Sequence, residues 1–176
     1  MTVTLVLGGA RSGKSAHAEG LLDGTRPATY VATARRDPAD REFAARIARH
    51  IARRPARWST VETADLRELF ASAGHADPPL LVDDLATWLT ALLDEAGAWE
   101  SGELERVHGR IADTVRALEN CACDVVLVSA ETGLGIVPAT ASGRLFRDEL
   151  GALNAAVAEV STEVKLLIAG IPLRLR

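Results

Sequence analysis

The sequence predicts an α/β fold: an open, mostly parallel β-sheet with helices on both faces. Two patterns carry this prediction. Short apolar runs alternate along the chain with longer segments whose apolar residues recur every three or four positions, the order expected of βαβ units. The short runs are also apolar almost throughout, which is typical of strands covered by helices on both faces.

The N-terminal part of the chain contains two predicted strands and two predicted helices in alternation. The apolar run Thr2–Leu7 predicts the first strand, and a glycine-rich turn leads from it into a helix from about Gly13 to Leu22. The run Ala28–Thr33 predicts the second strand. Arg41–Arg54 has the 3.6-residue apolar period of an amphipathic helix.

The middle of the chain continues the alternation. Pro79–Asp84 predicts the third strand, and the apolar segment Leu85–Trp99 after it predicts a helix. Glu103–Cys121 predicts a long amphipathic helix, and Asp124–Ala130 predicts the fourth strand.

The C-terminal part completes the pattern. Ala141–Ser161 predicts a helix, Glu163–Ile171 predicts the fifth strand, and Pro172–Arg176 predicts a short last strand. The polar segment Ala71–Pro79 predicts a loop and not a domain boundary. With no linker and no internal repeat, the chain is expected to form a single domain over residues 1–176.

The composition limits the function classes. A net charge of −4 and an isoelectric point near 5.6 argue against a general nucleic-acid-binding protein. No segment has the roughly 18 apolar residues that a membrane helix needs, and no basic segment of a secretory signal opens the sequence. We therefore expect a cytoplasmic protein with no membrane insertion and no nucleic-acid partner. Cys121 and Cys123 are expected to be ordinary buried residues, neither a disulfide nor a metal site.

The segment GGARSGKS after the first strand matches G-x-x-x-x-G-K-[ST] in full. Glycines let successive backbone N–H groups point at phosphate oxygens, and the following helix adds its positive N-terminal end. Lys14 is expected to reach the β- and γ-phosphates and to act in catalysis, and Ser15 to bind Mg²⁺. The predicted nucleotide-binding residues of this loop are Gly8, Gly9, Ala10, Arg11, Ser12, Gly13, Lys14 and Ser15.

An acidic partner for the metal is expected at the end of another strand. The segment LLVDD provides two candidates, because Asp83 and Asp84 follow the third predicted strand directly. We expect Asp83 to hold Mg²⁺ as a Walker-B carboxylate and to belong to the nucleotide site. Aspartate is also favoured at helix N-caps, and we expect Asp84 to cap the next helix.

Positive charge is concentrated between Arg35 and Arg57, where eight arginines meet three acidic residues. His50 lies within this segment, near the apolar stripe of the predicted helix. Three interpretations remain open from the residues alone. The segment is a solvated basic face, a nucleic-acid contact helix, or a triphosphate-handling helix in which a neutral imidazole acts as nucleophile or proton carrier.

Motifs along the whole chain resemble one known family. In order, they are LVLGGARSGKS, YVATA, AARIARHIARRPARW, VETADL, LVDDLATWLTALL, VVLVSAETGLGIVPAT, GRLFRDELGALNAAVA and LLIAGIPLRL. They are similar to the bifunctional adenosylcobinamide kinase / adenosylcobinamide-phosphate guanylyltransferases of cobalamin assembly. The loop motif alone is generic. The histidine-containing segment and GLGIVP with the following helix are the specific parts.

The resemblance implies a P-loop, RecA-like fold and a homo-oligomer, a trimer in the family. It also implies two reactions: phosphorylation of adenosylcobinamide by ATP or GTP, and transfer of GMP from GTP to the resulting phosphate. The products of the second reaction are adenosylcobinamide-GDP and pyrophosphate. By motif, His50 is the residue that carries GMP. Further positions that match nucleotide-contacting residues are Thr33, Ala34, Arg35, Arg54 and Glu62.

Other functions remain open at this point. A relative could keep only the kinase or only the guanylyltransferase reaction. The loop alone also fits a kinase of another small metabolite. A P-loop ATPase acting as a regulatory or nucleic-acid module is a further alternative, against which the net charge speaks. Arg144 and Arg147 are candidates for phosphate contacts and equally for surface salt bridges.

Overall fold

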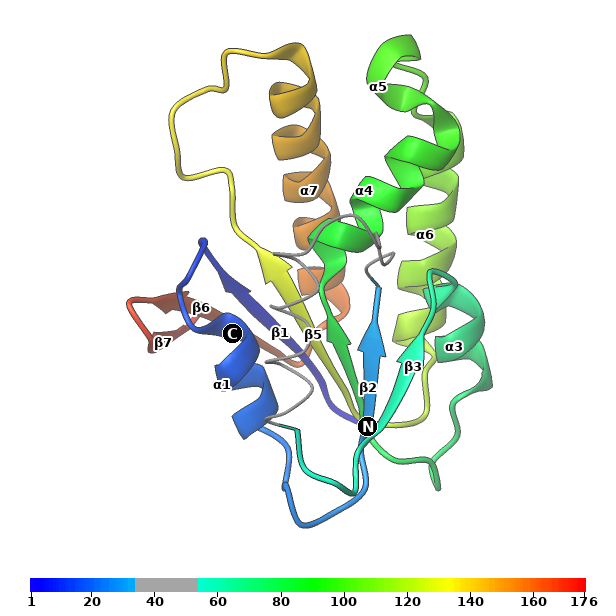
Figure 1. The fold of residues 1–176 in the computed structure, drawn as a ribbon. Helices are drawn as coiled ribbons and strands as arrows, with labels where there is room; N and C mark the ends of the chain where they lie inside the picture. The colour runs from blue at the N-terminus through cyan, green and yellow to red at the C-terminus, as the bar shows by residue number, and fades with distance from the viewer. Residues whose placement is uncertain (34–53) are drawn as a thin grey trace.

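The computed structural model describes residues 1–33 and 54–176 and contains one seven-stranded sheet in the order β3-β2-β4-β5-β1-β6-β7 (Figure 1). Every neighbouring pair is parallel except β6 and β7. The strands are β1 Val3–Gly8, β2 Thr29–Ala32, β3 Ser59–Glu62, β4 Leu80–Asp83, β5 Val125–Ala130, β6 Glu163–Ile168 and β7 Ile171–Arg174.

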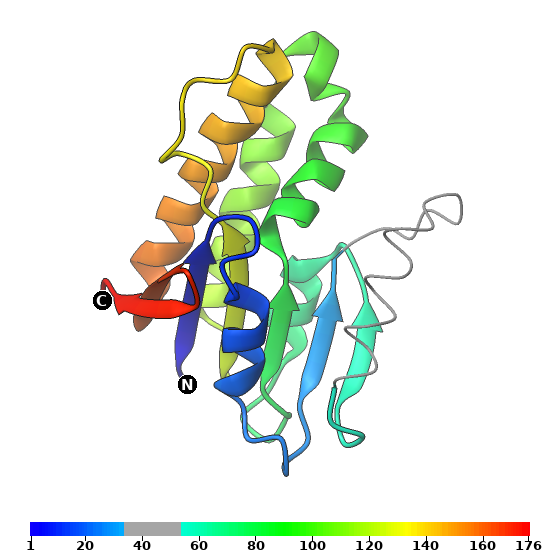
Figure 2. The ribbon, with the colours of Figure 1, turned by 60° about the vertical axis from the view of Figure 1, so that its left-hand side comes forward.

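Helices cover both faces of the sheet, as predicted (Figure 2). One face carries α1, and the other carries α3, α4, α6 and α7. The described helices are α1 Lys14–Gly20, α3 Leu66–Ser72, α4 Leu85–Ala96, α5 Ala98–Ser101, α6 Glu105–Glu119 and α7 Ala141–Val160. The mostly parallel α/β prediction is therefore confirmed.

Alternation along each strand divides the core into two layers. Leu5 of β1 packs in the larger cluster with residues of α3, α4, α6 and α7. Val6 points to the opposite face, where it packs with Ala18 of α1 and Tyr30 of β2. All six residues of β1 are buried, which explains why its sequence is apolar on both faces.

Side-chain caps define where several helices begin. Asp84 accepts a hydrogen bond from the backbone N–H of Thr87 at 2.8 Å and caps α4, so the predicted role of Asp84 is confirmed. Thr140 caps α7 through the N–H of Gly143. The two cysteines are buried and unbridged, as predicted, with their sulfur atoms 3.6 Å apart.

The structure corrects three element boundaries. The predicted helix Leu85–Trp99 is broken at Gly97, whose φ of 62° ends α4 in a left-handed cap. The predicted strand Glu163–Ile171 ends at Ile168, because Ala169 and Gly170 form a tight turn with positive φ. Ile171 therefore opens β7, the short last strand.

Two described elements had no sequence prediction, namely β3 and α3. The predicted helix Arg41–Arg54 lies outside the described residues except for Arg54 itself. Across residues 1–33 and 54–176, no helix is both long enough and apolar enough to cross a membrane.

Candidate nucleotide-binding site

The predicted phosphate loop joins the buried strand β1 to α1. Gly13 has a φ of 89° and Arg11 a φ of 58°, so the chain turns sharply just before α1 begins. The N–H of Gly170, in the β6–β7 turn, donates to the carbonyl of Ser12 at 3.0 Å and holds the loop from behind. Within the described part of the chain, the buried Ser12 Oγ has no hydrogen-bond partner.

Gly8 shows why the first glycine of the motif has no side chain. A Cβ at this position would overlap Ser12 Oγ and would lie 3.1 Å from the carbonyl oxygen of Leu167. At Gly9, in contrast, an added Cβ meets no atom within 4 Å. The close approach of loop and sheet therefore depends on Gly8 and not on Gly9.

Replacing Gly8 by alanine is expected to lower the free energy of unfolding by about 1–3 kcal/mol, because the methyl group forces loop and strand apart. Urea unfolding without nucleotide measures this change. The matched control is Gly9→Ala, which we expect to stay within about 0.5 kcal/mol of the wild type. Equal losses in both variants would mean that the close contact at Gly8 does not stabilise the loop.

A hydrogen-bonded cluster lies beside the loop, at the carboxyl end of β4. Ser15 Oγ donates to Asp83 Oδ1 at 3.2 Å, and the Tyr30 hydroxyl donates to Asp83 Oδ2 at 2.6 Å. Burial, and then the Asp83 carboxylate, raise the pKa of Tyr30 well above its usual range. The phenol therefore stays protonated and acts as a fixed donor to the carboxylate.

The fold explains why these three side chains meet. Strand β5 lies between β1 and β4, so the loop and Asp83 are not on neighbouring strands. Helix α1 contacts β1, β5 and β4, and this crossing brings Ser15 over Asp83. Tyr30 is paired with Leu81, two residues before Asp83 on the same face, and its long ring spans that difference.

Arg54 contacts the cluster through the face of the Tyr30 ring. Its guanidinium carbon lies 3.2 Å from the centroid of the Tyr30 ring, and its Nη1 donates to Thr60 Oγ1 at 3.0 Å. A guanidinium over an aromatic face is an attractive cation–π contact. Arg54 is thus held at the edge of the same cluster that contains Asp83.

Two other predicted site residues, Thr33 and Glu62, lie at the carboxyl ends of β2 and β3, at the same edge of the sheet as Asp83. Thr33 is buried, and its hydroxyl donates to the carbonyl of Asp84 at 2.7 Å. Asp83 and Glu62 are each paired with Ala32, one on either side of it. Because β2 lies between β4 and β3, two strand spacings separate the backbone of Glu62 from that of Asp83 by about 10 Å.

The end of β5 lies between the two strands that carry the phosphate loop and Asp83. The N–H of Glu131 donates to the carbonyl of Gly8 at 3.1 Å. Asn154 of α7 accepts from Ser129 Oγ at 2.6 Å and donates to the carbonyl of Ala130 at 3.0 Å, which fixes where β5 ends. The strand end beside the loop is therefore held in place by α7.

The two arginines of α7 already have other partners. Arg144 donates to the carbonyls of Pro138 and Ala139, at 3.0 and 2.8 Å. Arg147 pairs with the adjacent Asp148 at 2.9 Å. The contact of Arg147 is a surface salt bridge, the predicted alternative to phosphate binding, whereas the contacts of Arg144 are hydrogen bonds to backbone carbonyls.

Only part of the predicted site lies within the described residues. The structure brings together the loop, Ser15, Asp83 and Arg54. The predicted residues Ala34, Arg35 and His50 lie outside the described residues. Tyr30 was not predicted as a site residue, although its place in the motif YVATA could have drawn attention to it.

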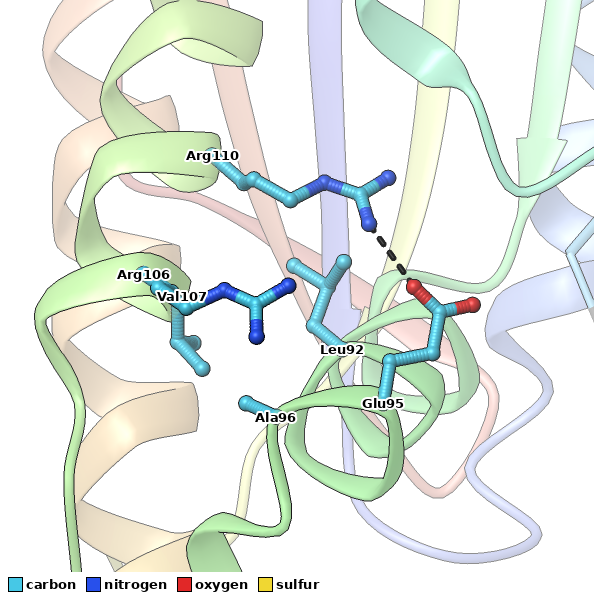
Figure 3. Close-up of a pocket in the computed structure, with 6 residues that line it drawn as sticks. All are labelled: Leu92, Glu95, Ala96, Arg106, Val107 and Arg110. Carbon is cyan, nitrogen blue, oxygen red and sulfur yellow. Dashed lines mark hydrogen bonds and ion pairs between the residues drawn. The ribbon is translucent and has the colours of Figure 1, made fainter.

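A shallow hollow on the helical layer is a separate feature (Figure 3). It lies between α4 and α6, and the ion pair of Arg110 Nη1 with Glu95 Oε2, 2.8 Å long, borders it. None of its lining residues belongs to the loop or to the strand ends described above. These residues are Leu92, Glu95, Ala96, Arg106, Val107 and Arg110.

Known proteins resemble this chain over nearly its full length. It is 37% identical over 180 residues to the bifunctional adenosylcobalamin biosynthesis protein CobU of Escherichia coli (strain K12), covering 98% of both chains. The identity to the protein of the same name in Salmonella typhimurium (strain LT2) is also 37%, with the same coverage. To the bifunctional adenosylcobalamin biosynthesis protein CobP of Pseudomonas aeruginosa it is 40% over 174 residues, covering 98% of this chain and 96% of the relative.

A sequence model described as cobinamide kinase / cobinamide phosphate guanyltransferase matches residues 4–175. This range contains the phosphate loop, the acidic end of β4 and every element of the sheet except the first residue of β1. The P-loop NTPase-like fold agrees with the observed sheet and loop. The chain therefore belongs to the cobinamide kinase / cobinamide phosphate guanyltransferase family.

Proposed function

We propose that this protein phosphorylates adenosylcobinamide with ATP or GTP and then transfers GMP from GTP to adenosylcobinamide phosphate. The products of the second reaction are adenosylcobinamide-GDP and pyrophosphate. The contact that supports this proposal most directly is Ser15 Oγ to Asp83 Oδ1, at 3.2 Å, beside a complete phosphate loop. The family description, cobinamide kinase / cobinamide phosphate guanyltransferase, supplies the identity of the acceptor.

The loop and the acidic strand end fit a Mg²⁺ ion. Mg²⁺ prefers hard oxygen ligands and is usually bound through one or two carboxylates together with substrate phosphates. Ser15 and Asp83 offer a hydroxyl and a carboxylate of this type, and the described residues contain no group of three or more acidic, histidine or cysteine side chains that could hold a metal ion by itself. When bound, Mg²⁺ would neutralise charge on the phosphates during transfer.

We assign separate roles in phosphoryl transfer to residues of this chain. The loop amides from Gly8 to Ser15 cradle the phosphates, and Lys14 neutralises charge on the phosphoryl group in transfer. Asp83 holds the metal, and Tyr30 orients Asp83. We assign the further nucleotide contacts to Thr33, Ala34, Arg35, Arg54 and Glu62, as the family resemblance implies.

We propose that guanylyl transfer proceeds through His50. A neutral imidazole nitrogen attacks the α-phosphorus of GTP, an N–P bond forms, and the bond to pyrophosphate breaks. A phosphate oxygen of adenosylcobinamide phosphate then attacks the same phosphorus and releases the histidine. Two transfers at phosphorus thus replace one direct transfer from GTP to adenosylcobinamide phosphate.

Both reactions also require a domain assignment, an oligomeric state and a cellular compartment. We propose that one domain, residues 1–176, carries both reactions and that the protein acts as a homo-oligomer, a trimer by family resemblance. ATP and GTP are cytoplasmic substrates, so we place the protein in the cytoplasm. Because its net charge is −4, we do not propose a nucleic-acid partner.

The experiment that tests the proposed function is product analysis by mass spectrometry. Purified protein is incubated with adenosylcobinamide, Mg²⁺ and ATP, and separately with adenosylcobinamide phosphate, Mg²⁺ and GTP. We expect the phosphate in the first reaction and adenosylcobinamide-GDP in the second. Only one product would reveal a single-activity relative. Hydrolysis stimulated by DNA or RNA, with neither product, would favour the regulatory ATPase instead.

Replacing Tyr30 by phenylalanine is expected to weaken Mg²⁺ binding in the kinase reaction. The variant keeps the ring under Arg54 but removes the donor to Asp83 Oδ2, so the carboxylate is no longer oriented. Loss of such an outer partner typically costs about 10–100-fold in metal affinity or activity. The measurement is the Mg²⁺ concentration that gives half-maximal rate, which we expect to rise about tenfold or more.

A second variant separates orientation from packing. Tyr30→Leu removes the hydroxyl and also the ring beneath Arg54, and we expect a lower unfolding free energy in addition to the Mg²⁺ effect. If Tyr30→Phe binds Mg²⁺ and turns over like the wild type, Tyr30 has a packing role only.

A further inference from the structure

The loop between β5 and α7, residues 131–140, exposes three large apolar side chains within four consecutive residues. Leu134 is 80% exposed, Ile136 96% and Val137 60%. Clustered apolar side chains in water are uncommon unless a ligand or partner covers them. No other loop of the described residues shows as many.

This β5–α7 loop is braced at both ends. At its start, Glu131 Oε1 accepts a hydrogen bond from the N–H of Gly133 at 2.6 Å. At its end, Arg144 binds the carbonyls of Pro138 and Ala139, and Thr140 caps α7. The apolar side chains therefore project from a loop whose two ends have defined contacts.

The position of the loop links it to the phosphate site. Its first N–H, from Glu131, donates to the carbonyl of Gly8 in the phosphate loop at 3.1 Å. In both ribbon views the β5–α7 loop rises from the carboxyl edge of the sheet above the phosphate loop (Figures 1 and 2). An acceptor whose reacting group lies at the nucleotide phosphates has its bulk on this side.

We propose that Leu134, Ile136 and Val137 form the contact surface for the corrin ring of the acceptor. This inference rests on the proposed function. A corrinoid is a broad macrocycle edged with methyl groups and amide-bearing arms, and its reacting hydroxyl or phosphate ends one arm. Three apolar side chains match the methyl-rich edge, whereas nucleotide phosphates need polar donors. The surface thus holds the acceptor body while the arm reaches the phosphate loop.

A second copy of this chain is the competing occupant. A different apolar group, on β6, β7 and the residue after β7, already offers a surface at the end of the sheet, where β7 is the last of the described strands. Its exposed members are Ile168, Ile171, Leu173 and Leu175. The β5–α7 loop differs from that group because it is hydrogen-bonded to the phosphate loop, and this continuity favours the substrate.

The test uses Leu134→Ser and Ile136→Ser in the full chain, with Ile136→Leu as the conservative variant and Leu175→Ser as the matched exposed control. Each serine variant is expected to raise the KM for adenosylcobinamide about tenfold, the loss expected for one apolar side chain removed from a contact. The affinity for ATP and the kcat at saturating acceptor should stay within about twofold of the wild type. Ile136→Leu and Leu175→Ser should keep the wild-type KM.

Equilibrium dialysis measures the binding of adenosylcobinamide through the absorbance of its corrin ring. This second readout does not depend on turnover. Light scattering gives the oligomeric mass of every variant. An unchanged KM and unchanged dialysis binding in both serine variants would overturn the inference. A fall in oligomeric mass that parallels the loss of activity would also overturn it, in favour of a subunit contact. If the wild type makes neither product, the proposed function itself fails, whereas wild-type turnover with unaffected variants rejects the corrin surface alone.

Discussion

Replacing His50 by alanine is expected to abolish covalent attachment of GMP to the protein while phosphoryl transfer to adenosylcobinamide continues. In the proposed mechanism only guanylyl transfer needs the imidazole, because the kinase reaction passes the γ-phosphoryl group directly to the acceptor hydroxyl. Removal of a nucleophile typically costs several orders of magnitude in rate, so we expect guanylyl transfer to fall by about a thousandfold or more.

The measurement uses GTP labelled at the α-phosphate. The protein is incubated with this GTP and Mg²⁺ and then denatured, and the label on the chain is counted. A phosphoramidate to histidine should survive alkali and be lost in mild acid. The matched control is His75→Ala, which removes an exposed histidine from the loop before the amino end of β4, at the opposite end of that strand from Asp83, and should keep full labelling.

Two outcomes would contradict this prediction. Label that persists in His50→Ala would assign the nucleophile to another residue. Absence of label in the wild type, with GTP still bound, would exclude the covalent route and leave direct transfer. Lys14→Ala separates these cases from a general loss of nucleotide binding, because it should reduce labelling and kinase activity together.

The central part of the fold could be predicted because burial on both faces leaves a clear sequence signal. Strands β1, β4 and β5 are apolar on both faces and sit in the middle of the sheet, so their sequences differ sharply from the surrounding helices. The two adjacent aspartates could also be separated in advance. Asp84 caps α4, a position that aspartate favours, whereas Asp83 accepts a hydrogen bond from Ser15.

The sequences of β3, at one edge of the sheet, and of the nearby helix α3 have no such apolar pattern. All four residues of β3, Ser59–Glu62, are exposed, because among the described strands β3 lies at the edge of the sheet and pairs with β2 alone. Helix α3 is short, and only Leu66 and Phe70 are buried, so too few turns were present for an apolar period to be recognised. Both elements form through contacts with distant parts of the chain.

Tyr30 illustrates why the site was only partly predictable. Its hydrogen bond to Asp83 joins residues 53 positions apart and depends on the register of β2 against β4. Asn154 is a similar case, since its two hydrogen bonds to β5 require α7 to pack against that strand. A local motif identifies the loop and the carboxylate, whereas the side chains that orient them come from the tertiary fold.

Replacing Asp83 by asparagine is expected to slow phosphoryl transfer by about a hundredfold or more and to raise the Mg²⁺ requirement. Asparagine keeps the size and one oxygen of aspartate but removes the negative charge that balances the metal. Tyr30 and Ser15 both carry hydroxyl groups that can accept as well as donate, so the amide can still be paired and the fold retained. The measurement is kcat against Mg²⁺ concentration, with urea unfolding to confirm the fold.

Asp84→Asn is the matched control, because it makes the same chemical change one residue away. Asparagine caps helices as well as aspartate does, so α4 should keep its N-terminal hydrogen bond to Thr87 and the kinase rate should change less than about threefold. Equal losses in both variants would show that charge at this strand end matters in general and not as a metal ligand. The guanylyl reaction gives a further distinction. If one loop holds the nucleotide in both reactions, Asp83→Asn slows both, whereas selective loss of the kinase would require a second site for GTP.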